Sequence, residues 1–128
     1  MDTNDSMEVI IRSVDDAIFT LENGNMLEEA DTVELSDKTR LTVTEKKMPL
    51  DSDVYFFIGM AVASITGIGK NVLTSLLTDW IKKLIEKWSK KKKDPVIEKP
   101  IAILLFDNIQ MEFWISGTEI EIRQIQNH

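Results

Sequence analysis

The chain has 128 residues, of which 43% are hydrophobic and 29% charged, a composition typical of one globular domain spanning residues 1–128. It contains no cysteine and a single histidine, His128, so the sequence offers neither a thiolate site nor the machinery of a Ser–His catalytic pair. The net charge of −7 is unevenly distributed, because residues 54–93 carry +6 between two acidic flanks.

Residues 1–50 form an acidic part that we predict to be rich in strands. The run "EVIIRSV" is short and apolar, which favours a strand. The following residues 14–30 allow two interpretations. Asn23-Gly24 is a favoured pair for a tight hairpin turn. The same stretch also fits a short helix with Ser13 as N-cap, Asp16 completing a capping box and Gly24 after the last turn.

The stretch "TVELSDKTRLTV" is predicted to be a β-hairpin. Val33 and Leu35 alternate with polar residues, and so do Leu41 and Val43 on the other side of the polar "SDKT" turn. This alternation is typical of strands with one buried face.

Residues 96–126 give the clearest β signal, a three-strand antiparallel meander. "PIAILLF" is a continuous apolar run, and "IQMEFWI" and "TEIEIRQI" alternate strictly between apolar and polar residues. We expect the meander to bury Ile101, Ile103, Leu105, Met111, Phe113, Ile115, Ile120 and Ile122. The fold class that follows is α+β, with the N-terminal strand-rich region and the C-terminal meander packed around one long or broken central helix.

The central segment, residues 54–93, is predicted to be helical and to change from apolar to basic. Val54 to Gly69 contains no charged residue, and from Val72 onward apolar residues recur at helical spacing. Repeated spacing of four widens the apolar arc, since each step rotates it by about 40°. The arc is wider than packing on one sheet requires. Its neighbours are therefore expected to be the sheet with the preceding apolar stretch, a second subunit, or lipid.

We take this apolar arc as a candidate interaction face and call it the helix face. It consists of Val72, Leu73, Leu76, Leu77, Trp80, Ile81, Leu84, Ile85 and Trp88.

The stretch "SITGIGKNVLTSLL" raises the question of a phosphate-binding loop. A Walker-type loop needs glycine, four residues and then Gly-Lys-Ser/Thr. Counting back from Gly69-Lys70 places Ser64 at the first glycine position, and Asn71 stands where the hydroxyl residue belongs. The motif therefore fails at two positions. Gly67 and Gly69 are better interpreted as small packing residues or as a break between helical pieces.

Seven of the 15 basic residues lie between Lys82 and Lys93. We predict that they contact an anionic surface, through Lys82, Lys83, Lys87, Lys90, Lys91, Lys92 and Lys93. Lysines and tryptophans beside an apolar stretch are also typical of a membrane boundary. The alternative hypothesis is thus a small single-pass or peripheral membrane protein anchored through residues 54–93. The uncharged run of 16 residues is, however, shorter than the roughly 20 that span a bilayer.

An apolar stretch containing Gly, Ala and Ser leads into "LLTDWIKKL", then a basic run, then a hairpin that ends in "GTEIEI". Over residues 54–122 this order resembles the effector-associated constant component proteins of bacterial conflict systems. Its local anchor is Leu77, Trp80 and Ile81. The resemblance implies a small non-enzymatic companion of a toxic or proteolytic effector, although the strand-rich first 50 residues depart from that pattern.

The sequence therefore predicts a non-catalytic protein-interaction or accessory module, and the resemblance points to a bacterial multi-component system. We expect no enzyme activity, metal, cofactor or small-molecule substrate, because the acids fall in turns and on strand exteriors. A protein partner or self-association is expected, membrane contact remains open, and nucleic acid is disfavoured by the acidic net charge. The acidic start "MDTNDSMEVI" predicts a cytoplasmic protein, with possible contact to the inner face of the membrane.

Overall fold

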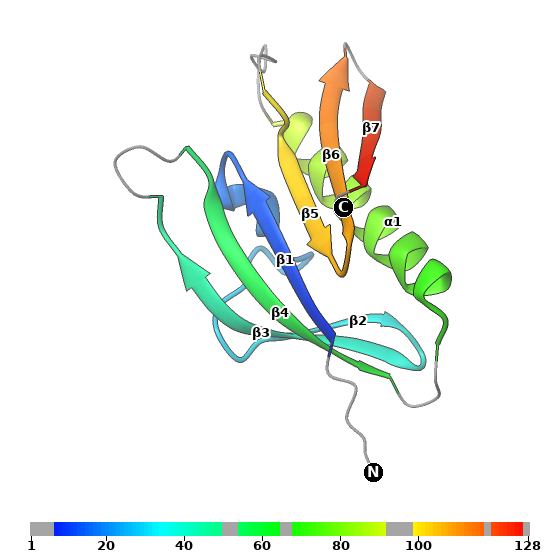
Figure 1. The fold of residues 1–128 in the computed structure, drawn as a ribbon. Coiled ribbons are helices and arrows are strands. Elements are labelled where there is room, and N and C mark those ends of the chain that lie inside the picture. The colour runs from blue at the N-terminus through cyan, green and yellow to red at the C-terminus, as the bar shows by residue number, and fades with distance from the viewer. Residues whose placement is uncertain (1–6, 50–53, 65–67, 92–98, 117–118, 127–128) are drawn as a thin grey trace.

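In the computed structural model, a seven-stranded antiparallel sheet packs on one long helix (Figure 1). The structure describes residues 7–49, 54–64, 68–91, 99–116 and 119–126. The elements in chain order are β1 (Met7–Ser13), the one-turn 3-10 helix η1 (Asp16–Phe19), β2 (Thr32–Ser36), β3 (Thr39–Lys47), β4 (Phe56–Ser64), α1 (Lys70–Ser89), β5 (Ala102–Phe106), β6 (Ile109–Ser116) and β7 (Glu119–Gln126).

The strands follow the order β2-β3-β4-β1-β5-β6-β7, which places β1 at the centre of the sheet. β1 pairs with β4 on one side and with β5 on the other. The α+β class is thereby confirmed. The sheet is larger than the predicted three-strand meander, because β1 joins the N-terminal strands and the C-terminal strands into one surface.

Strict alternation of apolar and polar residues located the strand faces correctly. In β6, Met111, Phe113 and Ile115 are buried, and in β3 Leu41 and Val43 are buried. The two segments form the hairpins β5–β6–β7 and β2–β3 that the sequence predicts. The polar partners of these residues take the opposite face, as the period of two requires.

The sequence predicted the wrong face of β5 to be buried. Ala102, Leu104 and Phe106 point into the core, whereas Ile103 and Leu105 are only partly buried on the opposite face. A continuous apolar run has no polar residue to mark the exposed side. The sequence therefore does not indicate which of the two alternating sets of side chains faces the core. Of the other residues expected in the core, Ile101 is buried. Ile120 and Ile122 are partly buried and pack against the core.

The helical prediction for the first half of residues 54–93 was also wrong. Phe56 to Ser64 form β4, which lies between β3 and β1 and buries Ile58, Met60 and Val62. The segment carries no charge because it is a strand inside the sheet. Uncharged composition alone does not separate a buried strand from a buried helix.

Both interpretations of residues 14–30 are correct in part. A one-turn helix forms at Asp16–Phe19, but its N-cap is Asp15, whose side chain accepts a hydrogen bond from the Ala17 N–H at 3.0 Å. The chain then turns at Gly24, with φ of 87°, and a single bridge joins Thr20 to Met26. The expected hairpin is thus reduced to a turn.

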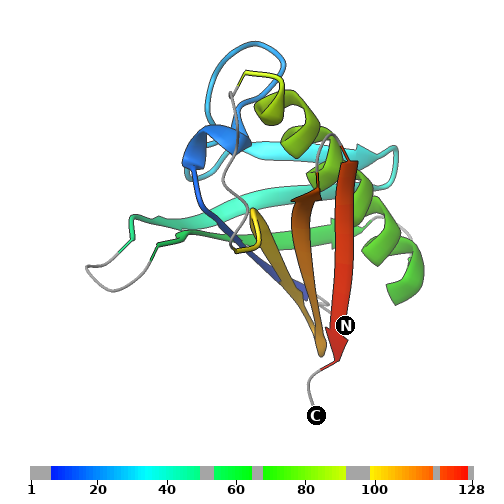
Figure 2. The same ribbon diagram turned by 90° about the horizontal axis from the view of Figure 1, so that it is seen from above.

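Helix α1 lies in the hollow of the bent sheet. Seen from above, the sheet curves so that its β2 edge and its β7 edge lie on either side of the helix (Figure 2). A register shift between Val43 and Glu45 marks an irregularity in β3, and such bulges increase the local bend of a strand. One curved sheet therefore covers an arc of the helix that a flat sheet would leave open.

Candidate interaction surface

The helix face is mostly committed to the protein's own core. Six of its nine residues are buried, namely Leu73, Leu77, Ile81, Leu84, Ile85 and Trp88. Leu76 and Trp80 are partly buried, and only Val72 is well exposed, at 55%. The wide apolar arc is therefore explained by the curvature of the sheet and by η1, and the six buried side chains are not available to a partner.

The two tryptophans of α1 attach the helix to the segment around η1. The Trp88 indole N–H donates to Oδ2 of Asp15 at 3.0 Å, and the ring of Trp80 lies 6.4 Å from that of Phe19, measured between centroids. These aromatic side chains pack inside the protein. Two of the three residues on which the family resemblance depends, Leu77 and Ile81, are likewise fully buried in the core.

The lysine cluster lies at the C-terminal end of α1. Lys83, Lys90 and Lys91 are exposed, while Lys82 and Lys87 are partly buried. The Lys87 ammonium donates to the carbonyl of Thr20 at 3.3 Å, so this lysine holds the helix against its neighbour. Lys92 and Lys93 lie outside the described residues.

Exposed acids interrupt this basic surface. Asp79 and Glu86 are exposed on the same stretch of helix as Lys83 and Lys90. The spacings of four between Asp79 and Lys83, and between Glu86 and Lys90, are those at which helical ion pairs form. The exposed side of α1 is therefore of mixed charge along the described residues.

The start of α1 answers the question of a phosphate loop. Gly69 is the N-cap residue and supplies no capping side chain, and Lys70 begins the helix. The Lys70 ammonium forms an ion pair with Asp107, which follows β5. Gly67 lies outside the described residues. Lys70 thus connects the helix to the β5–β6 turn, and its charge is already matched by a carboxylate.

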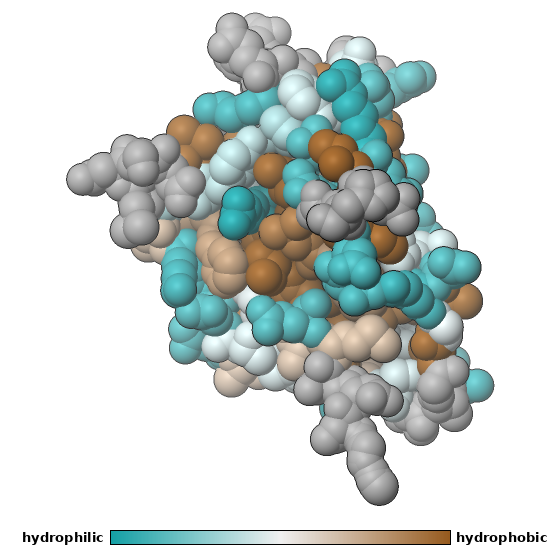
Figure 3. Space-filling model, viewed as in Figure 1, coloured by the Kyte–Doolittle hydropathy of each residue, from teal (hydrophilic) through white to brown (hydrophobic). Residues whose placement is uncertain are grey.

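The face of the sheet that points away from α1 carries an apolar surface that the sequence did not predict. We call it the outer patch and define it as Ile10 of β1, Phe57 of β4, and Ile103 and Leu105 of β5. All four are partly exposed, and none belongs to the core cluster around α1. Figure 3 looks onto this face and shows apolar side chains gathered at its centre, with hydrophilic residues around them.

The strand registers bring the four residues together. Ile10 lies opposite Leu105, and Arg12, the next outward residue of β1, lies between Phe57 and Ile103. Three strands that are distant in the sequence contribute to the patch. Side chains at neighbouring positions on one face of a sheet are close enough for direct contact. The patch therefore spans β4, β1 and β5, with the exposed Arg12 between Phe57 and Ile103.

Charged and aromatic residues border the outer patch on β6 and β7. The Arg123 guanidinium lies 4.4 Å from the centroid of the Trp114 ring, and its Nε donates to Oε1 of Glu121 at 2.9 Å. The Trp114 indole N–H donates to Glu112 at 3.2 Å. Ile125, 41% exposed, lies on the same face of β7 and is separated from Leu105 by Gln110 of β6. An apolar centre with a polar border is the usual anatomy of a protein interface.

A tyrosine lies at the end of this surface that is nearest to the start of β4. The Tyr55 hydroxyl donates to the carbonyl of Pro100 at 3.2 Å. Burial raises the pKa of Tyr55, the negative charge of Glu112 raises it further, and the positive charge of Arg12 acts in the opposite direction. The phenol is therefore kept neutral and serves as a hydrogen-bond donor.

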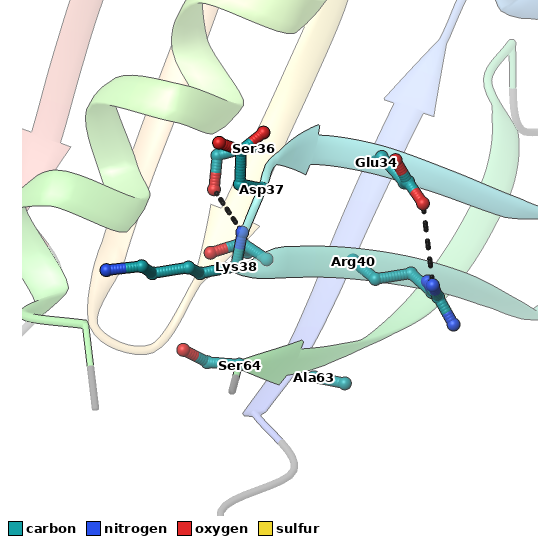
Figure 4. Close-up of a pocket in the computed structure, with 8 residues that line it drawn as sticks. Glu34, Ser36, Asp37, Lys38, Arg40, Ala63 and Ser64 are labelled. Carbon is teal, nitrogen blue, oxygen red and sulfur yellow. Dashed lines mark hydrogen bonds and ion pairs between the residues drawn. The ribbon is translucent and has the colours of Figure 1, made fainter. Parts of the chain in front are cut away.

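A hollow lies at the tip of the β2–β3 hairpin (Figure 4). Its lining residues are Glu34, Ser36, Asp37, Lys38, Thr39, Arg40, Ala63 and Ser64. The backbone N–H of Lys38 donates to Ser36 Oγ at 3.2 Å, and Arg40 pairs with Glu34 at 3.4 Å. The Thr39 hydroxyl is buried without a hydrogen-bond partner. The contacts of Ser36 and Arg40 lie within the hairpin and account for these side chains by its local structure.

Within the described part of the chain, no group of three His, Cys, Asp or Glu side chains is placed to hold a metal ion. Over the same residues, no helix has both the length and the apolar character needed to cross a membrane.

Comparison with known protein families, with characterised proteins and with solved structures gives no match to this chain. The interpretation of the outer patch therefore depends on its own geometry and chemistry.

One sequence signal could have located the outer patch. In "EVIIRSV" and "IAILLF", apolar residues occupy both parities of the strand. Such runs are typical of strands that are covered on both faces. The helix covers one face of β1 and β5, so a second apolar cover is expected for the other face.

Proposed function

We propose that this chain is a non-catalytic protein-interaction module that docks a partner protein through the outer patch. The observation that carries the proposal is the partly exposed apolar surface of Ile10, Phe57, Ile103 and Leu105 on the face of the sheet opposite α1. Exposed apolar patches bordered by polar residues mark interaction sites on soluble proteins.

The partner element that suits this surface is an amphipathic segment with an apolar side and a border of both charges. Domains are built from packed layers, and a sheet whose strands are apolar on both faces is completed by a layer on each. Arg12 offers positive charge beside Phe57 and Ile103, Glu112 of β6 offers negative charge beside Ile103, and Arg123 lies one strand further away on β7. The resemblance of residues 54–122 to effector-associated constant component proteins supports an accessory role in a bacterial multi-component system.

The proposal is tested first by site-specific photo-crosslinking in cells. A photoreactive residue in place of Leu105 should capture one defined partner, whereas the same residue in place of Ser75, on the exposed side of α1, should not. Equal capture from both positions would contradict the outer patch as the docking surface.

The captured protein is then purified and its affinity measured by calorimetry against two matched variants. Leu105→Glu should weaken binding at least about tenfold, since the few residues that dominate binding cluster near the centre of an interface and the variant also places a charge there. Val72→Glu places the same charge at the one well-exposed residue of the helix face and should leave the affinity unchanged. The reverse result, with binding lost in Val72→Glu only, would assign docking to α1 instead. Both variants are first checked for wild-type melting temperatures.

A further inference from the structure

The two edges of the sheet differ in how they are protected. Strand β2, at one edge, has five residues, shifts register against β3 between Glu34 and Ser36, and contacts α1. Strand β7, at the other edge, has eight residues and pairs with β6 in unbroken register from Ser116–Glu119 to Ile109–Gln126. Natural sheets protect their edges by shortness, bulges, charged side chains or a covering element. Over its described residues β7 is neither short nor bulged, and its protection is charge, in the exposed Glu119, Glu121 and Arg123.

We infer that β7 is the contact between two copies of this chain, which pair antiparallel about a two-fold axis through Ile122. A symmetric strand pair of this kind joins the two sheets into one, with the backbone groups of both edges hydrogen-bonded. The inference concerns the isolated protein and does not depend on the proposed docking of a partner.

The charges of β7 select the register. With the axis at Ile122, each Glu121 lies directly opposite Arg123 of the second copy. An axis at Glu121 would oppose that carboxylate to its own copy, and an axis at Arg123 would do the same for the guanidinium. An axis at Ile120 would oppose Glu119 to Glu121. Opposite charges at facing positions stabilise a strand pair, and like charges destabilise it.

The existing ion pair is well placed to extend across the axis. Glu121 and Arg123 already interact at 2.9 Å within one strand, and their side chains remain 49% and 51% exposed. A guanidinium has five N–H donors, so Arg123 can keep its bond to Glu121 and also reach the carboxylate of the second copy. The four side chains then form a ring of alternating charge on the outer face.

On the opposite face of β7, apolar contact adds to the pairing. Ile122 packs against the core but is only partly buried, and in this register it meets Ile122 of the second copy. Because the axis is perpendicular to the sheet, the two outer patches would lie on the same side of the joined sheet. The dimer would therefore present its docking surface twice.

Cysteine crosslinking tests the register directly, because the chain has no cysteine of its own. In Ile122→Cys the two thiols face each other, with Cα atoms about 4.5–5.5 Å apart, inside the range that a disulfide bridges. In the matched control Ile120→Cys, on the same face of the same strand, the two cysteines are displaced by four residues, or roughly 14 Å. Mild oxidation should link the first variant into dimers and leave the second monomeric. Equal crosslinking of both variants, or of neither, would overturn the inference.

Charge exchange gives an independent test by light scattering. The wild type should show a concentration-dependent dimer in the micromolar range. Glu121→Arg and Arg123→Glu should each be monomeric, because each variant opposes like charges. An equimolar mixture of the two should recover the dimer, since the charges are again complementary across the axis. The control Arg40→Glu reverses a similar exposed ion pair near the other edge and should dimerise like the wild type. A monomeric wild type, or a mixture that stays monomeric, would refute the β7 contact.

Discussion

The assignment of the helix face to the core predicts a large difference between two substitutions on α1. Ile81 is fully buried, whereas Val72 is 55% exposed. Both are β-branched residues in one helix, so replacement by alanine changes helix propensity in the same direction at both positions. The difference between Ile81→Ala and Val72→Ala therefore reports burial.

The magnitude follows from the environment of each side chain. Removal of a fully buried isoleucine side chain costs about 2–5 kcal/mol, through lost transfer free energy and the cavity left behind. A domain of ordinary stability unfolds with about 5–15 kcal/mol, so Ile81→Ala is expected to remove a large share of the total. Val72→Ala should stay within about 0.5 kcal/mol of the wild type.

Urea denaturation followed by tryptophan fluorescence measures both variants. With a denaturant slope of about 1–3 kcal/mol/M, Ile81→Ala should lower the midpoint by on the order of 1–2 M, while Val72→Ala should leave it nearly unchanged. If Ile81→Ala changed the free energy of unfolding by less than about 1 kcal/mol, Ile81 would not be a core residue. The helix face would then again be a candidate docking surface.

Three further predictions concern the attachment of α1, the tyrosine and the turn before β2. Trp88→Phe keeps an aromatic ring but removes the N–H donor to Asp15 together with part of the buried indole, and it should lower the free energy of unfolding by about 1–3 kcal/mol. A double-mutant cycle with Asp15→Ala isolates the bond and should show coupling, whereas strictly additive effects would contradict it. The pKa of Tyr55 should lie above its usual value in an absorbance titration and fall in Glu112→Gln. Because the neutral phenol is favoured in the folded state, its contribution to stability is fully present below the unfolded pKa and is lost as the pH rises through the folded pKa. Gly24→Ala should destabilise by about 1–2 kcal/mol in thermal melts, because φ is 87° and an L side chain is disfavoured there. The new Cβ meets no atom within 4 Å, so the change reports backbone conformation alone, and an unchanged melt would contradict the prediction.

Local alternation in the sequence determined much of the sheet. The period of two in "IQMEFWI" and "TEIEIRQI" fixed the strands β6 and β7, and the polar "SDKT" between alternating residues fixed the β2–β3 hairpin. The helical spacing from Val72 onward likewise fixed α1. These patterns are local because each polar residue marks the exposed side of its own strand or helix.

Where a segment is apolar throughout, no polar residue shows which side is exposed, and the type of element cannot be assigned from the sequence. The uncharged run before Gly69 fits a strand or a helix equally well, and pairing with β3 and β1 makes it β4. The same ambiguity concealed that Ile103 and Leu105 face away from α1. The outer patch could therefore not be predicted as a surface, although its strands were recognised as apolar.

The sequence by itself determined that the chain forms an α+β domain with an amphipathic helix and C-terminal hairpins, because those features depend on residues only a few positions apart. The tertiary structure decided which apolar surfaces are covered. Curvature of the sheet buried the wide face of α1, which the sequence had suggested as an interaction face. The central position of β1 brought Ile10, Phe57 and Leu105 together from three distant segments. Burial depends on contacts between elements far apart in the chain, and residue spacing within a single element does not encode them.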